Sequence, residues 1–256
     1  MLEHVQAIRY VTPLREGGSL PGIVEADDDG TYVVKFRGAG QGLKVLVAEV
    51  IVGEIGRAIG VRVPDMRAVA LDARIAKYEA DEEVQDLLTA SVGLNLGVDF
   101  LPGSFGYDGS RPPSRQEAAR VLWLDSFTAN VDRTWANPNL LVWHGQTWAI
   151  DHGAALYFHH SWPNRGSDPA RFASQPFDAS KHVLRDVADD LAPLHEDLAA
   201  IVRTALNNGV LAQVPDEWLE ATDMMPDPES VRTAYRLSLL ARLDNPSVWL
   251  PTGAAA

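Results

Sequence analysis

Three polar side chains occur in one stretch of the chain at spacings suited to phosphoryl transfer. Asp132 and Asn137 follow the pattern D-x-x-x-x-N, and Asp151 begins the triplet Asp151-His152-Gly153 further on. Phosphoryl transfer from a nucleotide needs a carboxylate that orients the attacking hydroxyl, and oxygen ligands that hold Mg²⁺ on the phosphates. We therefore predict Asp132 as the catalytic base, and Asn137 and Asp151 as ligands of Mg²⁺.

Two short apolar runs between these residues predict a β-hairpin. The runs cover residues 139–143 and 147–150, and His144-Gly145-Gln146 separates them. A glycine beside a polar residue supplies the positive φ that a tight hairpin turn needs. The hairpin would bring Asp151, at its end, close to the polar loop before it. Each loop Asp or Asn could instead serve only as a turn or cap residue, but three at these spacings favour a shared site.

A lysine and a glycine-rich turn near the N-terminus could contact the phosphates of a nucleotide. Lys35 lies in an apolar strand, where alternation places it on the face opposite to Val34 and Phe36. Gly17-Gly18-Ser19 belongs to a turn between strands, and backbone N–H groups of such turns can face phosphates. The turn is neither a Walker A sequence nor G-x-G-x-x-G. More often, a strand lysine is a surface residue and a Gly-Ser turn is only a loop.

The stretch Asn130-Val131-Asp132-Arg133-Thr134-Trp135-Ala136-Asn137 resembles the catalytic region of the HipA-like kinases. The motif of that family is close to N-x-D-R-H-x-x-N followed by D-x-G, so Thr134 departs from it where the family usually has His. The positions of the base and of the metal ligands are intact. The resemblance implies ATP and Mg²⁺, with transfer of the γ-phosphoryl group to a hydroxyl acceptor, either a protein Ser/Thr or a small molecule.

The resemblance also implies a partner for Lys35. HipA-like kinases carry a Glu at the start of a helix that leads into Gly-Leu/Val-x-Val-Pro. Here Glu49 lies near the start of a helix predicted over residues 43–59, which leads into Gly60-Val61-Arg62-Val63-Pro64. A Lys35–Glu49 ion pair would orient the lysine on the nucleotide.

The glycine-rich turn gains a role through the same resemblance. Gly17, Gly18 and Ser19 would lie over the nucleotide, and Ser19 is the only hydroxyl residue of this Gly17-Gly18-Ser19 turn. Because some relatives autophosphorylate a serine in this loop, a phosphate on Ser19 would place charge where the ATP phosphates bind and would switch the enzyme off.

The expected fold class is α+β, a two-lobed protein-kinase-like fold. Residues 1–103 would form a β-rich N-terminal lobe that binds ATP, and residues 104–256 an α-helical C-terminal lobe with the catalytic hairpin. The hinge between them would be Leu101-Pro102-Gly103-Ser104, at the start of a Gly/Pro-rich stretch. Periodicity and turn residues predict strands over residues 4–11, 21–26, 31–36, 66–78 and 94–101, and helices over residues 79–88, 114–129, 180–207 (broken at Pro193) and 228–243.

Composition narrows the class of protein. Lys and Arg number 22 against 35 Asp and Glu, a net charge of −13, which opposes non-specific binding of nucleic acid. The chain has no Cys, which excludes disulfides and thiolate chemistry. It shows neither a signal peptide at MLEHVQAIRY nor an apolar run near the ~20 residues of a membrane span. We therefore expect a cytoplasmic protein with no membrane partner.

Two other functions compete with a kinase. A catalytically weak nucleotide-binding pseudokinase would keep the fold without transfer, although Lys35, Asp132, Asn137 and Asp151 are all present. A metal-dependent hydrolase could combine Asp151 with several histidines, and the residues in question are His144, His152, His159 and His160. Against the hydrolase, neighbouring histidines such as His159 and His160 tend to point apart on an extended chain.

Overall fold

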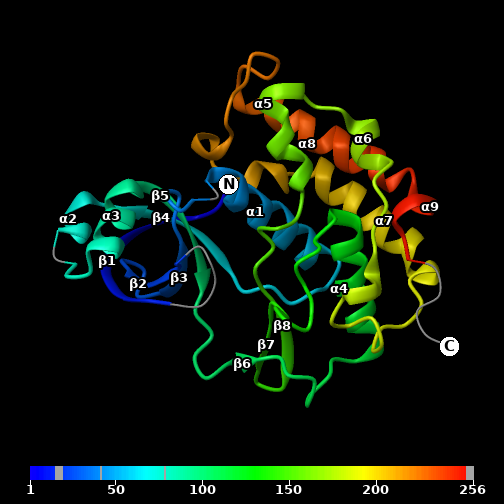
Figure 1. The fold of residues 1–256 in the computed structure, drawn as a ribbon, viewed down its shortest axis with the longest axis horizontal. Helices are drawn as coiled ribbons and strands as arrows, with labels where there is room; N and C mark the ends of the chain where they lie inside the picture. Colours follow the sequence, from blue (N-terminus) through cyan, green and yellow to red (C-terminus); the bar gives the residue numbers. More distant parts are fainter. Residues whose placement is uncertain (15–19, 41, 78, 252–256) are drawn as a thin grey trace.

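A computed structural model describes residues 1–14, 20–40, 42–77 and 79–251 (Figure 1). The predicted phosphate-facing turn Gly17-Gly18-Ser19 lies outside the described residues. The predicted mixture of strands and helices is confirmed, with strands gathered toward the N-terminus and helices toward the C-terminus. Among the described residues, none of the helices is both long enough and apolar enough to cross a membrane.

The N-terminal strands close into a five-stranded barrel rather than an open sheet. Around it the order is β1-β2-β3-β5-β4, and a parallel pairing of β1 with β4 closes the circle. The strands are β1 His4–Pro13, β2 Gly22–Ala26, β3 Thr31–Lys35, β4 Met66–Leu71 and β5 Gly93–Asp99. At the predicted turn between β2 and β3, Asp29 has a φ of 62° and Asp28 accepts a hydrogen bond from the Gly30 N–H at 3.0 Å.

Alternation along the strands fills the barrel and leaves Lys35 outside it. Tyr32, Val34 and Phe36 are buried in one hydrophobic cluster together with residues of β1, β2 and β4. Two short helices, α2 Ala73–Ala76 and α3 Glu82–Ala90, contribute Ala76, Val84 and Leu88 to the same cluster. Because successive side chains point to opposite faces, Lys35 lies on the outer face of β3.

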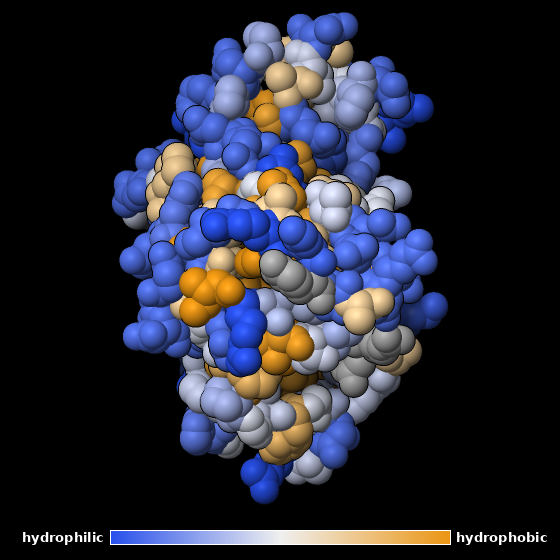
Figure 2. Space-filling model, turned by 90° about the vertical axis from the view of Figure 1, so that its left-hand side faces the viewer, coloured by the Kyte–Doolittle hydropathy of each residue, from blue (hydrophilic) through white to orange (hydrophobic). Residues whose placement is uncertain are grey.

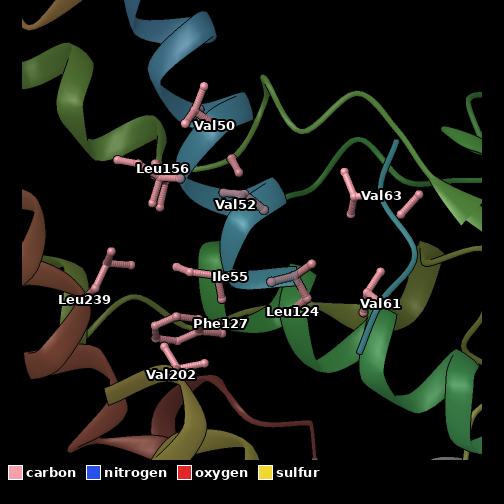
Figure 3. Packing of buried hydrophobic residues seen from close by; sticks show 14 of the residues in the cluster. Val50, Val52, Ile55, Val61, Val63, Leu124, Phe127, Leu156, Val202 and Leu239 are labelled. Carbon is pink, nitrogen blue, oxygen red and sulfur yellow. The ribbon is translucent and has the colours of Figure 1, made fainter. Parts of the chain in front are cut away.

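Helix α1, Leu43–Ala58, joins the barrel to the helical part of the molecule. Its side chains are apolar nearly all round, as expected of a helix buried on every side. It packs against α4 Arg115–Thr128 and α7 Ala192–Asn207, and the shared core extends to α8 Pro228–Leu243. Figure 3 shows Ile55 of α1 among residues of these helices, which are Leu124, Phe127, Val202 and Leu239, while Val50 lies further along α1, near Leu156. Burying each such side chain contributes about 1.5–3 kcal/mol.

A small sheet and several short helices complete the fold. The sheet has the order β6-β7-β8, with β6 Phe105–Gly106, β7 Leu140–Trp143 and β8 Gln146–Ala149. The predicted hairpin is therefore confirmed, and its turn residues His144 and Gly145 have φ values of 48° and 74°. The remaining α-helices described are α5 Trp162–Arg165, α6 Pro169–Ala173 and α9 Pro246–Trp249, and the 3₁₀ turns are η1 Tyr157–Ser161, η2 Ala179–Lys181, η3 Leu211–Gln213 and η4 Asp216–Trp218.

The predicted helix over residues 180–207 is wrong in its first part. Only η2 and a series of turns occupy the stretch before α7, which begins at Ala192 with Pro193 in its first turn. Proline is favoured at the start of a helix, since the N–H that it lacks would have no intrahelical partner there. The apolar residues Val183 and Leu184, which suggested helical spacing, are buried in the core from an irregular segment.

Hydrophilic side chains cover most of the face at the barrel end of the molecule (Figure 2). Hydrophobic residues lie there in small separate groups. This distribution agrees with the net charge of −13.

A buried arginine joins three segments of the helical part. Arg242 of α8 is fully buried, and its guanidinium donates to the carbonyls of Ser126 (2.9 Å), Phe127 (2.6 Å), Phe172 (2.8 Å) and Gln175 (2.7 Å). It also lies 4.4 Å from the centre of the Phe172 ring. Burial lowers the pKa of Arg242 to about 9. The side chain therefore holds the carbonyl end of α4, where the loop with Asp132 begins.

Replacing Arg242 by Met should lower the free energy of unfolding by about 4 kcal/mol, since each buried acceptor left without a donor costs about 1–3 kcal/mol and water recovers part of the loss. Urea unfolding measures the change. Arg236→Met is the matched control on the same helix, because Arg236 is half-buried and has no hydrogen bond with the described residues. A loss below about 1 kcal/mol for Arg242→Met would contradict this account.

Candidate active site

A pocket of about 430 Å³ lies between the barrel and the β7–β8 hairpin. Lys35 and Glu49 line it from the barrel side, and Asn137 and Asp151 line it from the hairpin side. Apolar residues form much of the remaining wall, including Val33, Val63, Val98, Leu101, Leu140 and Ile150. An apolar cleft with a few convergent polar groups is typical of a small-ligand site.

Lys35 connects two carboxylates at one side of the pocket. Its ammonium donates to Glu49 Oε1 and, at 2.7 Å, to Asp151 Oδ1. Burial opposes the charge of Lys35, but Glu49 and Asp151 outweigh it and raise the pKa of the lysine. Burial raises the pKa of Glu49, whereas for Asp151 the nearby Lys35 outweighs burial and lowers the pKa. The ion pair expected between Lys35 and Glu49 is therefore present, and Asp151 joins it.

The backbone around Asp151 explains why a glycine follows two residues later. Asp151 has a φ of 54°, a conformation that costs energy for a residue other than glycine and is often found at functional sites. A Cβ on Gly153 would lie 2.5 Å from Val45 Cγ1 and 3.1 Å from Glu49 Oε1. Gly153 thus allows the segment after β8 to pack directly on α1, which brings Asp151 close to Glu49.

Two amides hold the carboxylate of Asp132. Its Oδ2 accepts from Asn137 Nδ2 at 2.8 Å and from Asn139 Nδ2 at 3.2 Å. The Asn137 amide oxygen accepts no hydrogen bond from the part of the chain that the structure describes, so it is free to bind a cation. Asn139 was missed in the sequence because it lies outside the D-x-x-x-x-N pattern. Its positive φ of 48° marks it as a special position.

The donor set fits Mg²⁺ better than a protein-bound zinc ion. Within the described residues, no group of three or more His, Asp or Glu side chains could hold a metal. Asn137 and Asp151 offer two oxygen ligands beside the pocket, and Mg²⁺ is commonly held by one or two carboxylates plus substrate phosphates.

The histidines invoked for a metal-dependent hydrolase do not form a metal site. His159 is buried with Nδ1 2.8 Å from the Tyr235 hydroxyl, and His144 occupies the hairpin turn. His152 is buried with Nδ1 3.3 Å from Arg133 Nη2, and burial and the arginine lower its pKa to about 3. His152 and His159 thus each have a local polar partner at Nδ1, whereas the His144 side chain is exposed.

The segment expected as a hinge borders the pocket. Leu101 and Ser104 line it, and the Ser104 N–H donates to the Leu101 carbonyl at 3.1 Å. Trp143 of the hairpin donates from Nε1 to the Pro102 carbonyl at 3.0 Å. The segment is therefore a turn that borders the pocket and contacts the hairpin through Pro102.

Comparison with known proteins identifies the family of the chain. A model of the HipA-like kinase family matches residues 7–252. The comparison with curated proteins gave no match. Among solved structures, the Golgi casein kinase is similar to this chain with a TM-score of 0.41 at 13% identity, over 99% of this chain and 76% of the other. The family match includes the barrel, helix α1, the loop of Asp132 and the hairpin, and the chain belongs to the HipA-like kinase family.

Proposed function

We propose that the protein is an ATP- and Mg²⁺-dependent kinase that transfers the γ-phosphoryl group to a hydroxyl, with a protein Ser/Thr as the first acceptor class and a small molecule as the second. The observation that carries the proposal is the position of Lys35 Nζ between Glu49 and Asp151 at the edge of the pocket. An ammonium held between two carboxylates beside an apolar cleft suits binding of nucleotide phosphates.

Each polar residue of the site receives one role. Lys35, oriented by Glu49, binds the ATP phosphates, and the apolar wall accommodates the base. Asn137 and Asp151 hold Mg²⁺, which neutralises charge on the phosphates. Asp132 accepts the proton of the acceptor hydroxyl, whose oxygen forms a new bond to the γ-phosphorus as the bond to ADP breaks.

We assign Asp132 to the acceptor rather than to the nucleotide. Asn137 and Asn139 both line the pocket, whereas Asp132 does not line it and accepts hydrogen bonds from their amides. This difference in position is the reason for giving Asp132 and Asp151 separate roles.

The architecture follows from the same proposal. Residues 1–103 form the ATP-binding lobe and residues 104–256 the catalytic lobe, with the hinge at Leu101-Pro102-Gly103-Ser104. Gly17, Gly18 and Ser19, in the connection between β1 and β2, keep the phosphate-binding role that the resemblance to HipA-like kinases implies. The pocket between barrel and hairpin, bordered by Leu101 and Ser104, supports this division.

ATP should raise the melting temperature of the protein only when Mg²⁺ is present, because a ligand that binds the native state alone stabilises it by about 2.7 kcal/mol at one hundred times its Kd. A thermal-shift titration with ATP, with and without Mg²⁺, measures this effect. GTP and AMP serve as controls for the base and for the phosphates. The absence of any shift at millimolar nucleotide would contradict the proposal.

Transfer itself needs a separate assay. Incubation with γ-labelled ATP and Mg²⁺, alone and with cell lysate, should label a protein or release ADP. Binding of ATP without any transfer would instead identify a nucleotide-binding module of the pseudokinase type.

A further inference from the structure

A segment far downstream in the chain contacts the loop that carries Asp132. The Val183 N–H donates to the Arg133 carbonyl at 3.1 Å, and His182 forms an isolated β-bridge with Thr134. The segment begins with the short turn η2, and its Val183 and Leu184 belong to the hydrophobic core. Two consecutive residues after Asp132 are therefore held by backbone that is about fifty positions away.

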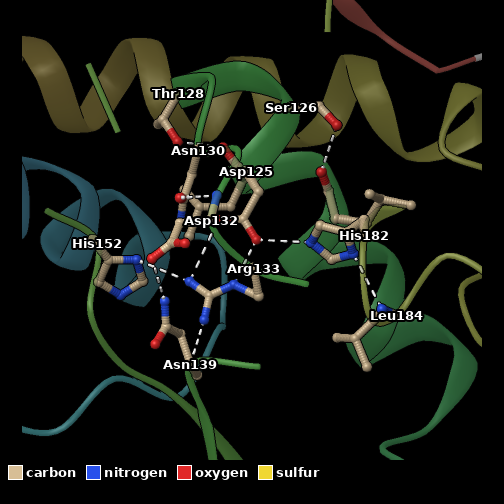
Figure 4. A network of polar contacts seen from close by, with 12 residues as sticks. Asp125, Ser126, Thr128, Asn130, Asp132, Arg133, Asn139, His152, His182 and Leu184 are labelled. Carbon is tan, nitrogen blue, oxygen red and sulfur yellow. Dashed lines mark hydrogen bonds and ion pairs between the residues drawn. The ribbon is translucent and has the colours of Figure 1, made fainter. Parts of the chain in front are cut away.

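The side chain of His182 continues this contact into the core. Its Nε2 lies 2.9 Å from Asp125 Oδ2, and its Nδ1 accepts the Leu184 N–H at 3.1 Å (Figure 4). A backbone N–H can only donate, so Nδ1 carries a lone pair and the proton is on Nε2. His182 is thus a neutral donor to Asp125, and its side chain is 2% exposed.

Asp125 accepts hydrogen bonds from residues on both sides of Asp132. Its carboxylate accepts from Asn130 Nδ2 at 3.0 Å and from Arg133 Nε at 2.6 Å, and both side chains of this ion pair are fully buried. The Asn130 side chain in turn accepts the Asp132 N–H at 3.2 Å. Burial opposes the charge of Asp125, but Arg133 and His182 outweigh it and lower the pKa of the carboxyl.

Arg133 extends the network to the metal-ligand side of the site. Its Nη1 donates to the carbonyl of Asn139 and, at 3.2 Å, to that of Ile150. Asn139 holds the Asp132 carboxylate, and Ile150 immediately precedes Asp151. Through these hydrogen bonds, the network connects the loop of Asp132 to the backbone next to Asp151. His182 completes it without adding net charge, because the Asp125–Arg133 pair is already neutral.

We infer that His182 is a positioning residue for phosphoryl transfer, which acts through Asp125 and Arg133 to hold the loop of Asp132 in its reactive geometry. The inference rests on the kinase function proposed above. His182 does not line the pocket, so it contributes nothing to nucleotide binding directly. Loss of such a supporting hydrogen bond commonly costs 10–100-fold in activity, and a misplacement of about 1 Å can cost 10²-fold.

Two variants of His182 and one control test the inference. His182→Leu removes the donor to Asp125 at similar volume, whereas the Nε2 amide of His182→Gln can donate from nearly the same place. His195→Leu is the matched control, because His195 is another buried histidine of the helical part and instead accepts from Trp123 Nε1 at 3.3 Å. All variants are compared well below their melting temperatures.

His182→Leu should lower kcat by about 10–100-fold while KM for ATP and the Kd of ATP·Mg²⁺ stay within about twofold of the wild type. His182→Gln should recover most of kcat, and His195→Leu should lower the melting temperature without changing kcat. A rise in KM or Kd equal to the fall in kcat, or a His195→Leu enzyme as slow as His182→Leu, would overturn the inference.

Hydrogen–deuterium exchange tests the positioning role of His182 without measuring catalytic activity. Peptides covering residues 130–139 should exchange faster in His182→Leu than in the wild type, His182→Gln or His195→Leu, while residues 31–37 remain unchanged. Unchanged protection of residues 130–139 in His182→Leu would refute positioning. If the wild type transfers no phosphate, the kinase proposal fails, but the exchange experiment still decides whether His182 orders the loop.

Discussion

Asp132→Asn should abolish phosphoryl transfer and leave Mg²⁺-dependent binding of ATP intact. The new side chain has the same shape, and its oxygen can still accept from Asn137 or Asn139, so the pocket is preserved. An amide, however, cannot take the proton of the acceptor hydroxyl. Loss of a general base commonly costs 10²–10⁴-fold in rate.

Asp151→Asn should behave differently, although it is the same chemical change. Asp151 lines the pocket and accepts from Lys35 at 2.7 Å. In the proposed role, its replacement removes an anionic ligand of Mg²⁺ and one of the two charges that balance the lysine. We expect ATP binding to lose its dependence on Mg²⁺ together with the activity.

Calorimetric titration of both variants with a non-hydrolysable ATP analogue, with and without Mg²⁺, separates the two roles. The wild type and Asp108→Asn are the controls, because Asp108 is an exposed loop carboxylate outside the pocket. If Asp132→Asn loses the effect of Mg²⁺ and Asp151→Asn keeps it, the assignments are reversed.

A second large effect is expected at Lys35 and Glu49. Lys35→Met and Glu49→Gln should each lower kcat/KM by about 10²-fold, or about 2.7 kcal/mol, because each removes one half of a buried ion pair at the phosphate site. Once either residue is replaced, the ion pair that orients Lys35 no longer forms, so replacing the second residue removes little more. The double variant should therefore resemble either single variant, with a coupling energy of up to about 3 kcal/mol.

Initial rates of ADP release for the wild type, the two single variants and the double variant measure the coupling energy. Glu54→Gln is the control on the same helix, because Glu54 pairs with Arg57 and does not line the pocket. It should retain wild-type activity. Strictly additive losses at Lys35 and Glu49 would show that the two residues act independently.

Local patterns were sufficient to predict the elements that carry the site. The capping box of Ser114 and Glu117 is present at the start of α4, and a positive φ occurs at both turn residues of the β7–β8 hairpin. Alternation placed Lys35 on the strand face opposite to Val34 and Phe36, and helical spacing placed Glu49 in α1. These features depend on neighbours in sequence, whose geometry is set by the periods of strand and helix.

The closing of the barrel and the support behind Asp132 could not be predicted in this way. The parallel pairing of β1 with β4 joins segments about sixty residues apart, and Asp125 meets His182 across 57 positions. Asn139 lacks a pattern that distinguishes it from an ordinary loop residue. The apolar spacing around Val183 and Leu184 even suggested a helix where the chain is irregular.

The sequence by itself indicated which residues face the pocket, because Lys35, Asn137 and Asp151 follow from a motif or a local period and Glu49 from the resemblance to HipA-like kinases. Only the tertiary structure decided that Asp151 joins the Lys35–Glu49 pair and that Asp125, Arg133 and His182 hold the loop of Asp132. The physical reason is burial. A charged or polar group in the core must find partners of matching geometry, and those partners are brought by whichever segments pack there, irrespective of their distance along the chain.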